Sequence, residues 1–76
     1  MKSIGIKFEG SRSSYKRFYF KEDVKWHLNR LAEELKYGQA LEIKIGNNHH
    51  YIDYDYDQSH LSRVDDVMYH VNKYLA

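Results

Sequence analysis

Two short segments in which apolar and polar residues alternate constrain the fold of this chain most strongly. They occupy residues 4–8 and 41–45, and their apolar positions are Ile4, Ile6, Phe8, Leu41, Ile43 and Ile45. Alternation with a period of two is typical of a strand with one buried face. Such strands have only one apolar side to hide, so we expect a sheet that is covered on one face.

Each of these segments is followed by a turn that begins with glycine and then by a segment rich in aromatic residues. The turns lie at residues 10–14 and 46–48, and the aromatic segments at residues 15–20 and 50–56. Glycine adopts the backbone angles that tight turns require. We therefore predict two hairpins, with the aromatic segments as their second strands.

A helical pattern follows each hairpin. At about 100° per residue, the apolar side chains of each pattern form one stripe. The stripe residues are Val24, Leu28, Leu31 and Leu35 in the first helix and Val64, Val67, Val71 and Tyr74 in the second. We expect the first helix to stop at Gly38, because glycine often ends a helix, and the second to begin at Ser62 as a capping residue.

The order strand, strand, helix therefore occurs twice. Five of seven positions match in type between residues 24–30 and residues 67–73, where the sequences are VKWHLNR and VMYHVNK. This similarity indicates an internal duplication with units of about 1–38 and 39–76, although chance remains an alternative at this length. The predicted fold class is α+β, a tandem ββα-ββα repeat with a four-stranded, mostly antiparallel sheet and two helices on one face.

Length and composition restrict the class of protein. The chain has 76 residues, 42% hydrophobic and 30% charged, with no cysteine and no proline. We expect a single globular domain, residues 1–76. No run of about 18 apolar residues is available to cross a bilayer, and the first residues do not resemble a signal peptide. The expectation is a cytoplasmic protein with no membrane partner.

Charge is distributed unevenly along the chain. Residues 1–38 contain nine Lys and Arg against five Asp and Glu, whereas residues 39–76 contain three against six, which gives +4 and −3 within a net charge of +1. The basic half would attract phosphate groups. The alternatives are that the two halves attract each other or that the asymmetry has no function.

The uncovered face of the predicted sheet is the first candidate binding surface. Alternation directs a set of apolar and aromatic side chains inward, namely Ile4, Ile6, Phe8, Phe18, Phe20, Leu41, Ile43, Ile45, Ile52, Tyr54 and Tyr56. It directs rings and cations outward, namely Lys7, Tyr15, Arg17, Tyr19, Lys44 and Tyr51. RNA or single-stranded nucleic acid binds such faces, because bases stack on the rings while Lys and Arg contact the phosphates.

Acidic residues restrict where this ligand can lie. Glu9, Glu42, Asp53 and Asp55 share the outward face, so we expect binding over the first hairpin, with Arg12 in its loop as a further contact. Two other interpretations remain. The face can be an ordinary solvated surface with cross-strand pairs, or it can form a homodimer by sheet-to-sheet contact.

The outer faces of the helices are the second candidate surface. Trp26 with Arg30, and Tyr69 with Lys73, lie away from the apolar stripes at equivalent positions. Aromatic residues and Arg are enriched at binding hot spots, so these four residues suggest a protein-binding inhibitor or adaptor of a small viral (phage) or mobile-element type that acts on a host protein. The alternative is a rotated first helix in which Trp26 closes the core.

Motifs for chemistry are weak. Asp53, Asp55 and Asp57 alternate as in a calcium-binding loop, but Gln58 stands where glycine is needed and Val64 where a glutamate is needed. The histidines have no metal-ligand spacing, and no activated nucleophile or glycine-rich phosphate loop occurs. We therefore expect no enzyme activity, no catalytic residues, no metal and no cofactor.

Overall fold

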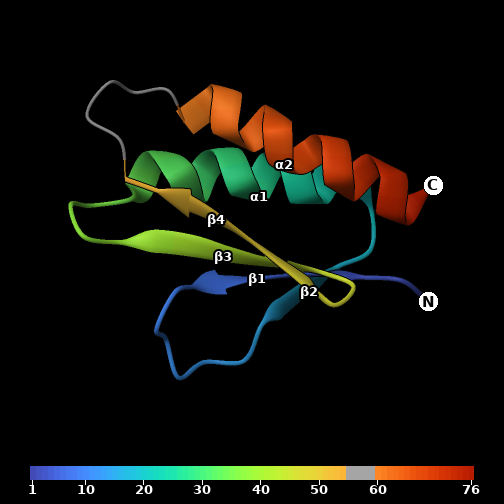
Figure 1. Cartoon of the computed structure of the whole chain (residues 1–76), viewed down its shortest axis with the longest axis horizontal. Helices are drawn as coiled ribbons and strands as arrows, with labels where there is room; N and C mark the ends of the chain where they lie inside the picture. The colour runs from blue at the N-terminus through green and yellow to red at the C-terminus, as the bar shows by residue number, and fades with distance from the viewer. Residues whose placement is uncertain (55–59) are drawn as a thin grey trace.

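Four strands and two helices follow one another in the order strand, strand, helix, strand, strand, helix (Figure 1). The structure is a computed structural model, and it describes residues 1–54 and 60–76. The elements are β1 (Ile4–Phe8), β2 (Lys16–Phe18), α1 (Lys21–Glu34), β3 (Ala40–Ile45), β4 (Asn48–Asp53) and α2 (His60–Leu75).

The strands form one sheet in the order β2-β1-β3-β4, and all neighbouring pairs are antiparallel. Ile4 of β1 lies opposite Phe18 of β2 on one side and opposite Ile45 of β3 on the other. The first strand of each hairpin is therefore central and the second is an edge strand. The predicted α+β class with one antiparallel sheet is confirmed.

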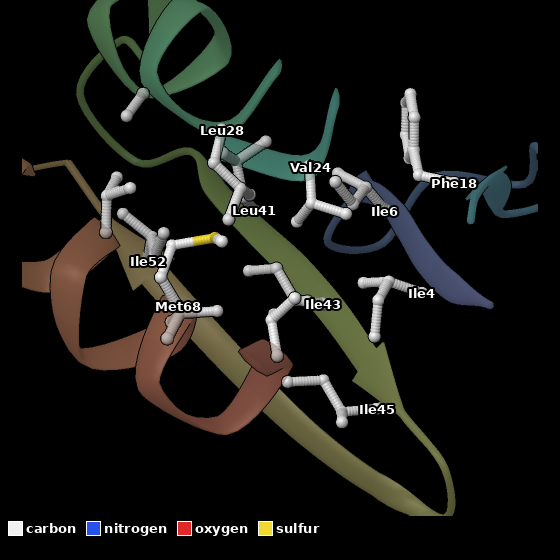
Figure 2. Packing of buried hydrophobic residues seen from close by; sticks show 14 of the residues in the cluster. Ile4, Ile6, Phe18, Val24, Leu28, Leu41, Ile43, Ile45, Ile52 and Met68 are labelled. Carbon is white, nitrogen blue, oxygen red and sulfur yellow. The ribbon is translucent and has the colours of Figure 1, made fainter. Parts of the chain in front are cut away.

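Both helices lie on the same side of the sheet (Figure 1). The apolar faces of the strands and the helix stripes meet in one cluster, part of which is drawn in Figure 2. Its largest fully buried side chains are Ile4, Leu28, Leu41, Ile43, Ile52, Val24, Val64 and Val71. Each such side chain contributes about 1.5–3 kcal/mol by leaving water, which makes this cluster the main source of stability in so short a chain.

Two aromatic residues that were expected in the core lie at the surface. Phe20 is 65% exposed, because β2 ends at Phe18 and Phe20 is the residue that precedes α1, outside the alternation of the strand. Phe8 is 36% exposed, because it lies beyond the part of β1 that β2 pairs with. The prediction that Phe20 points into the core is wrong, whereas Phe8 lies on the helix-facing side of β1, as alternation predicts, at the margin of the core.

Several predicted boundaries are also wrong. The second strands occupy residues 16–18 and 48–53 rather than 15–20 and 50–56, and α2 begins at His60 rather than at Ser62. Helix α1 ends at Glu34, because Leu35 turns its backbone to an extended conformation while its side chain stays buried. Gly38, with φ +84°, serves instead in the turn that the Gln39 N–H closes on the Lys36 carbonyl at 2.9 Å. Tyr56 lies outside the described residues.

Within residues 1–54 and 60–76, neither helix is long and apolar enough to cross a membrane.

Candidate binding site on the open sheet face

The strand register brings one set of polar and aromatic residues to the side of the sheet that the helices leave uncovered. We call this side the open face. Gly5 lies opposite Arg17 and Lys44, and Glu42 lies opposite Lys7 and Tyr51. Successive residues alternate between the faces, so these positions all project away from the helices. The register places on the open face Gly5, Lys7, Arg17, Ala40, Glu42, Lys44, His49, Tyr51 and Asp53, and the Tyr15 ring lies over Gly5.

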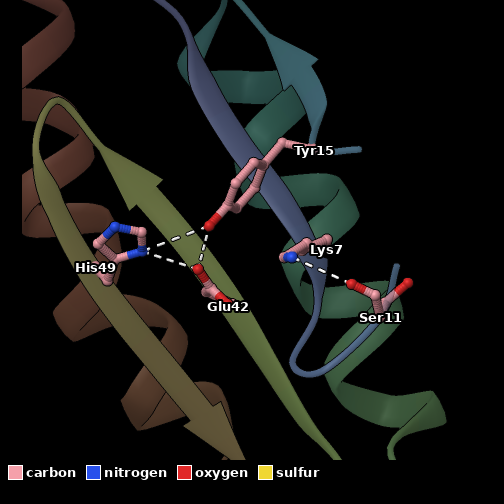
Figure 3. Close-up of polar contacts among 5 residues, drawn as sticks. All are labelled: Lys7, Ser11, Tyr15, Glu42 and His49. Carbon is pink, nitrogen blue, oxygen red and sulfur yellow. Dashed lines mark hydrogen bonds and ion pairs between the residues drawn. The ribbon is translucent and has the colours of Figure 1, made fainter. Parts of the chain in front are cut away.

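Tyr15 occupies the centre of the open face although it precedes β2. Its side chain lies across β1 at Gly5 (Figure 3), where a Cβ on Gly5 would come within 3.0 Å of the Tyr15 Cβ and 3.1 Å of its ring. A side chain larger than hydrogen would displace the ring. Glycine at position 5 therefore permits the close approach of Tyr15 to the sheet.

The Tyr15 hydroxyl reaches the neighbouring central strand. It donates a hydrogen bond to the Glu42 carboxylate, and the Nδ1 atom of His49 lies 2.8 Å from the same carboxylate oxygen (Figure 3). The distance from the Tyr15 hydroxyl to His49 Nδ1 is 3.4 Å. These contacts join the first loop, β3 and β4, and they leave the Glu42 side chain only 12% exposed.

The contacts of this cluster have opposite effects on its two acids. The hydrogen bond from Tyr15, with smaller effects from His49 and Lys7, holds the pKa of Glu42 below its ordinary value against the opposing effect of desolvation. The same hydrogen bond, with desolvation and the charge of Glu42, raises the pKa of Tyr15 to about 12. At neutral pH Tyr15 is therefore a neutral donor and Glu42 an anion with bound donors.

Two lysines flank the Tyr15 ring. The Nζ atoms of Lys7 and Lys44 lie 5.0 Å and 5.8 Å from its centroid, within the range of cation–π attraction. Lys7 also donates a hydrogen bond of 3.2 Å to the Ser11 carbonyl (Figure 3). The open face thus presents one aromatic ring between two ammonium groups.

The other residues expected at this site lie around that centre. Arg17 is on the edge strand β2 with its guanidinium 3.4 Å from the Ser3 hydroxyl, and Tyr51 is exposed on β4. Tyr19 is exposed but follows the end of β2, so the register does not place it on the open face. Arg12 is exposed in the loop between β1 and β2. The structure brings Lys7, Tyr15 and Lys44 together, and it leaves Tyr19 and Arg12 apart.

Three members of the cluster were missed or misjudged from the sequence. The sequence pattern assigns no role to Gly5 or His49, and it predicts Glu42 only as a charge that repels the ligand. A signal for His49 was present: pairing residues 41–45 with the segment after Gly46 across a two-residue turn places His49 opposite Lys44 and diagonal to Glu42. No local pattern points to the contact of Tyr15 with Gly5.

The second candidate surface lies on the outer faces of the helices. Trp26 and Tyr69 are each 60% exposed. The Arg30 guanidinium lies 5.2 Å from the Trp26 ring and the Lys73 ammonium lies 5.1 Å from the Tyr69 ring. Each helix therefore carries one exposed aromatic residue with a cation one turn later, and Trp26 does not close the core.

The predicted absence of a metal site concerns a region that is described only in part. Asp55 and Asp57 lie outside the described residues. Among the residues that are described, no three His, Asp or Glu side chains are placed to share a metal ion.

The chain was compared with protein-family models, with curated proteins and with solved structures, and none of them matches it.

Proposed function

We propose that this protein is a non-catalytic binding protein for single-stranded nucleic acid, RNA in particular, and that the open face is its binding surface. The observation that carries the proposal is the Tyr15 ring, which lies over Gly5 between the ammonium groups of Lys7 and Lys44. A base can stack on the outer side of the ring while the two lysines contact the flanking phosphates.

The shape of the open face favours single-stranded over double-stranded nucleic acid. The open face carries rings and cations, and the two helices of the described residues both lie on the opposite side of the sheet (Figure 1), so neither projects from the open face into a groove. In a duplex the base faces are stacked on one another and cannot reach such rings, whereas an unpaired strand can spread its bases over a sheet. The proposal therefore favours unpaired RNA or DNA over duplexes.

Dedicated nucleic-acid-binding domains are usually more basic than this chain, whose net charge is +1. How strongly this argues against nucleic-acid binding depends on the contacts that the carboxylates of the open face make. Glu42 already accepts from Tyr15 and lies beside His49, and Asp53 lies 4.0 Å from Arg63. Tyr15 is a neutral donor and the Asp53–Arg63 pair is exposed, so these contacts leave most of the negative charge in place, and this charge directs a nucleic-acid strand toward the first hairpin. We expect the strand to cross β1 and β2, where Arg17 extends the positive surface.

A salt titration of binding to a fluorescent single-stranded RNA pool tests this proposal. The logarithm of the affinity should fall linearly with the logarithm of the salt concentration, and Lys7→Ala and Lys44→Ala should each lower the slope by about one. Lys25→Ala, on the exposed side of α1, is the matched control and should leave the slope unchanged. Absence of binding at low salt, with the protein folded, would reject the proposal.

Two experiments separate nucleic-acid binding from the other uses of the open face. A homodimer formed through the open face would cover Tyr15 and Tyr51 and leave no room for nucleic acid. Light scattering measures the molar mass in solution, and the proposal expects that of a monomer. Tyr51→Ala should weaken RNA binding, whereas Tyr69→Ala removes an aromatic residue of similar exposure on the helix side and should not.

The second proposal is recognition of a protein partner, such as a host protein, by the helix side. It is supported by the two exposed aromatic–cation pairs, Trp26 with Arg30 and Tyr69 with Lys73. In a capture experiment from host lysate, a Trp26→Ala, Tyr69→Ala double variant should lose a partner that a Lys7→Ala, Lys44→Ala variant retains. Loss in the second variant instead would assign the partner to the open face.

An internal duplication would explain why the two helices carry the same surface. Its support is that Val24 and Val67, which occupy equivalent positions, are both buried, and that each exposed ring is followed by a histidine that packs edge-on against it. Under this proposal, homologous sequences should keep the two aromatic–cation pairs together or lose them together.

A further inference from the structure

A pocket of about 280 Å³ lies at the edge of the sheet, between the loop that joins β1 to β2 and the helix α1. Its volume is close to the lower end of the range for small-ligand sites. Its walls are formed by β1, the loop that follows it, β2 and α1, and the polar residues among them include Ser13, Ser14, Lys16, His27 and Arg30.

The pocket exists because β2 is short. Only Ile4, Gly5 and Ile6 of β1 are paired with β2, so Phe8 has no strand beside it on that edge. Residues 9–15 form the loop between β1 and β2, and Ser11, Ser13 and Ser14 of this loop line the pocket. The second hairpin has a two-residue turn between β3 and β4 and forms no such loop.

The polar lining of the pocket is cationic or neutral. It contains Lys7, Lys16 and Arg30, and no carboxylate lines it among residues 1–54 and 60–76. His27 lies on its floor with its ring 4.4 Å from the Phe18 ring. The pKa of His27 is lowered, first by desolvation and then by the charges of Lys16 and Arg30, against the opposing effect of Asp23. The positive charges of Lys16 and Arg30 therefore both act at His27, which lines the pocket.

We infer that this pocket binds a phosphate monoester. A monoester carries about −1.5 to −2 charges at neutral pH and three strong acceptor oxygens, and the pocket is lined by Lys16, Arg30 and serines, with Lys7 at its border with the open face. Arg30 can donate two parallel hydrogen bonds to such a group. An internal phosphodiester carries only one negative charge, and the nucleotides on both sides of it would also have to fit at the pocket. We therefore expect it to bind these cations more weakly than a terminal monoester does.

The pocket and the open face are adjacent. Lys7 lines the pocket and also approaches the Tyr15 ring, and its ammonium group holds the Ser11 carbonyl of the loop between them. Resting on the proposed function, the occupant is the terminal phosphate of the strand that crosses the open face. A free mononucleotide presents the same chemistry, so the test includes one.

The test measures binding of one oligonucleotide sequence with a 5′-phosphate, a 3′-phosphate or hydroxyl ends. A terminal phosphate should raise the affinity about tenfold or more, and Lys16→Ala or Arg30→Ala should remove this gain without abolishing binding of the hydroxyl form. Lys25→Ala is the control of the same charge on the same helix. The thermal midpoint of each variant verifies that it is folded.

An NMR titration of His27 gives a second readout. A bound dianion favours the imidazolium form, so inorganic phosphate or a mononucleotide should raise the pKa of His27. Sodium chloride at the same ionic strength is the control and should not raise it. Equal affinity for all three ends with an unaltered His27 titration would overturn the pocket inference but leave the open face intact if the hydroxyl form binds. A His27 response without oligonucleotide binding would support the pocket with a free monoester and overturn the proposed function.

Discussion

The Tyr15 hydroxyl donates a hydrogen bond to the Glu42 carboxylate, which links the loop before β2 to the centre of β3 across 27 positions of the chain. The ring of Tyr15 covers Gly5 on the way. This one contact orients the ring and gives a carboxylate in the middle of the open face a neutral donor.

The ring and the hydroxyl of Tyr15 have separable roles. Tyr15→Phe retains a surface for stacking and should keep most of the RNA affinity, whereas Tyr15→Ala should lower it about tenfold or more. Fluorescence anisotropy at fixed salt measures both. If the two variants lost the same affinity, the hydroxyl rather than the ring would be the feature that matters.

Gly5→Ala should displace the Tyr15 ring. The added Cβ would meet Tyr15 atoms at 3.0–3.1 Å, closer than ordinary contact, so the ring and its bond to Glu42 must shift. RNA binding should weaken in the single variant. In a Tyr15→Ala background the same substitution should have no further effect, and a double-mutant cycle measures the difference. Additive losses would contradict the steric explanation.

The Tyr15–Glu42 contact makes stability depend on pH at both extremes. Since the folded pKa of Glu42 is lowered, its contribution is present above about pH 4.3 and is lost as the pH falls through the folded pKa. Since the pKa of Tyr15 is raised to about 12, the contribution of Tyr15 is present below about pH 10 and is lost as the pH rises through about 12. Urea unfolding of Glu42→Gln should show a shallower acid slope, and an unchanged slope would contradict this assignment.

His50 gives a second pH dependence, on the helix side of β4. Its ring stacks on His70 with centroids 4.7 Å apart, and its pKa is lowered by desolvation first and by His70 and His49 next. Its contribution is present above about pH 6.5 and is lost as the pH falls through the folded pKa. His50→Phe keeps a ring on His70 and should flatten the fall of the thermal midpoint between pH 7.5 and about pH 5. Tyr51→Phe is the control and should keep the wild-type fall.

The core tolerates little truncation. Leu28 is fully buried at the centre of α1, and Leu28→Ala should lower the free energy of unfolding by about 2–5 kcal/mol. Small domains have about 5–15 kcal/mol in total, so this variant should be partly unfolded at mild temperature. Lys25→Ala on the exposed face should change it by less than about 0.5 kcal/mol. Circular dichroism during urea unfolding compares them, and similar midpoints would contradict the burial of Leu28.

Periodicity predicted the buried faces because it is a local property. Ile4, Ile6, Leu41 and Ile43 are buried as their alternation indicates, and Val24 and Leu28 are buried as their helical spacing indicates. The residues that share one face of a strand or helix are set by the periodicity of that element, whichever neighbour packs against the face.

Element ends were predicted less well because they depend on neighbours. Phe20 continues the aromatic pattern of β2, yet pairing with β1 stops at Phe18. Gly38 is a suitable helix terminator, yet α1 ends at Glu34, where the backbone turns while Leu35 stays in the core.

The amino-acid order alone therefore determined the succession of strands and helices, the side of each that is apolar, and the single covered face of the sheet. Tertiary structure alone decided that Tyr15 lies on Gly5, that its hydroxyl meets Glu42 and His49, and that a short edge strand leaves a cationic pocket. The physical reason is distance along the chain: these contacts join residues up to 34 positions apart, and only the strand order β2-β1-β3-β4 and its register bring them within hydrogen-bonding reach.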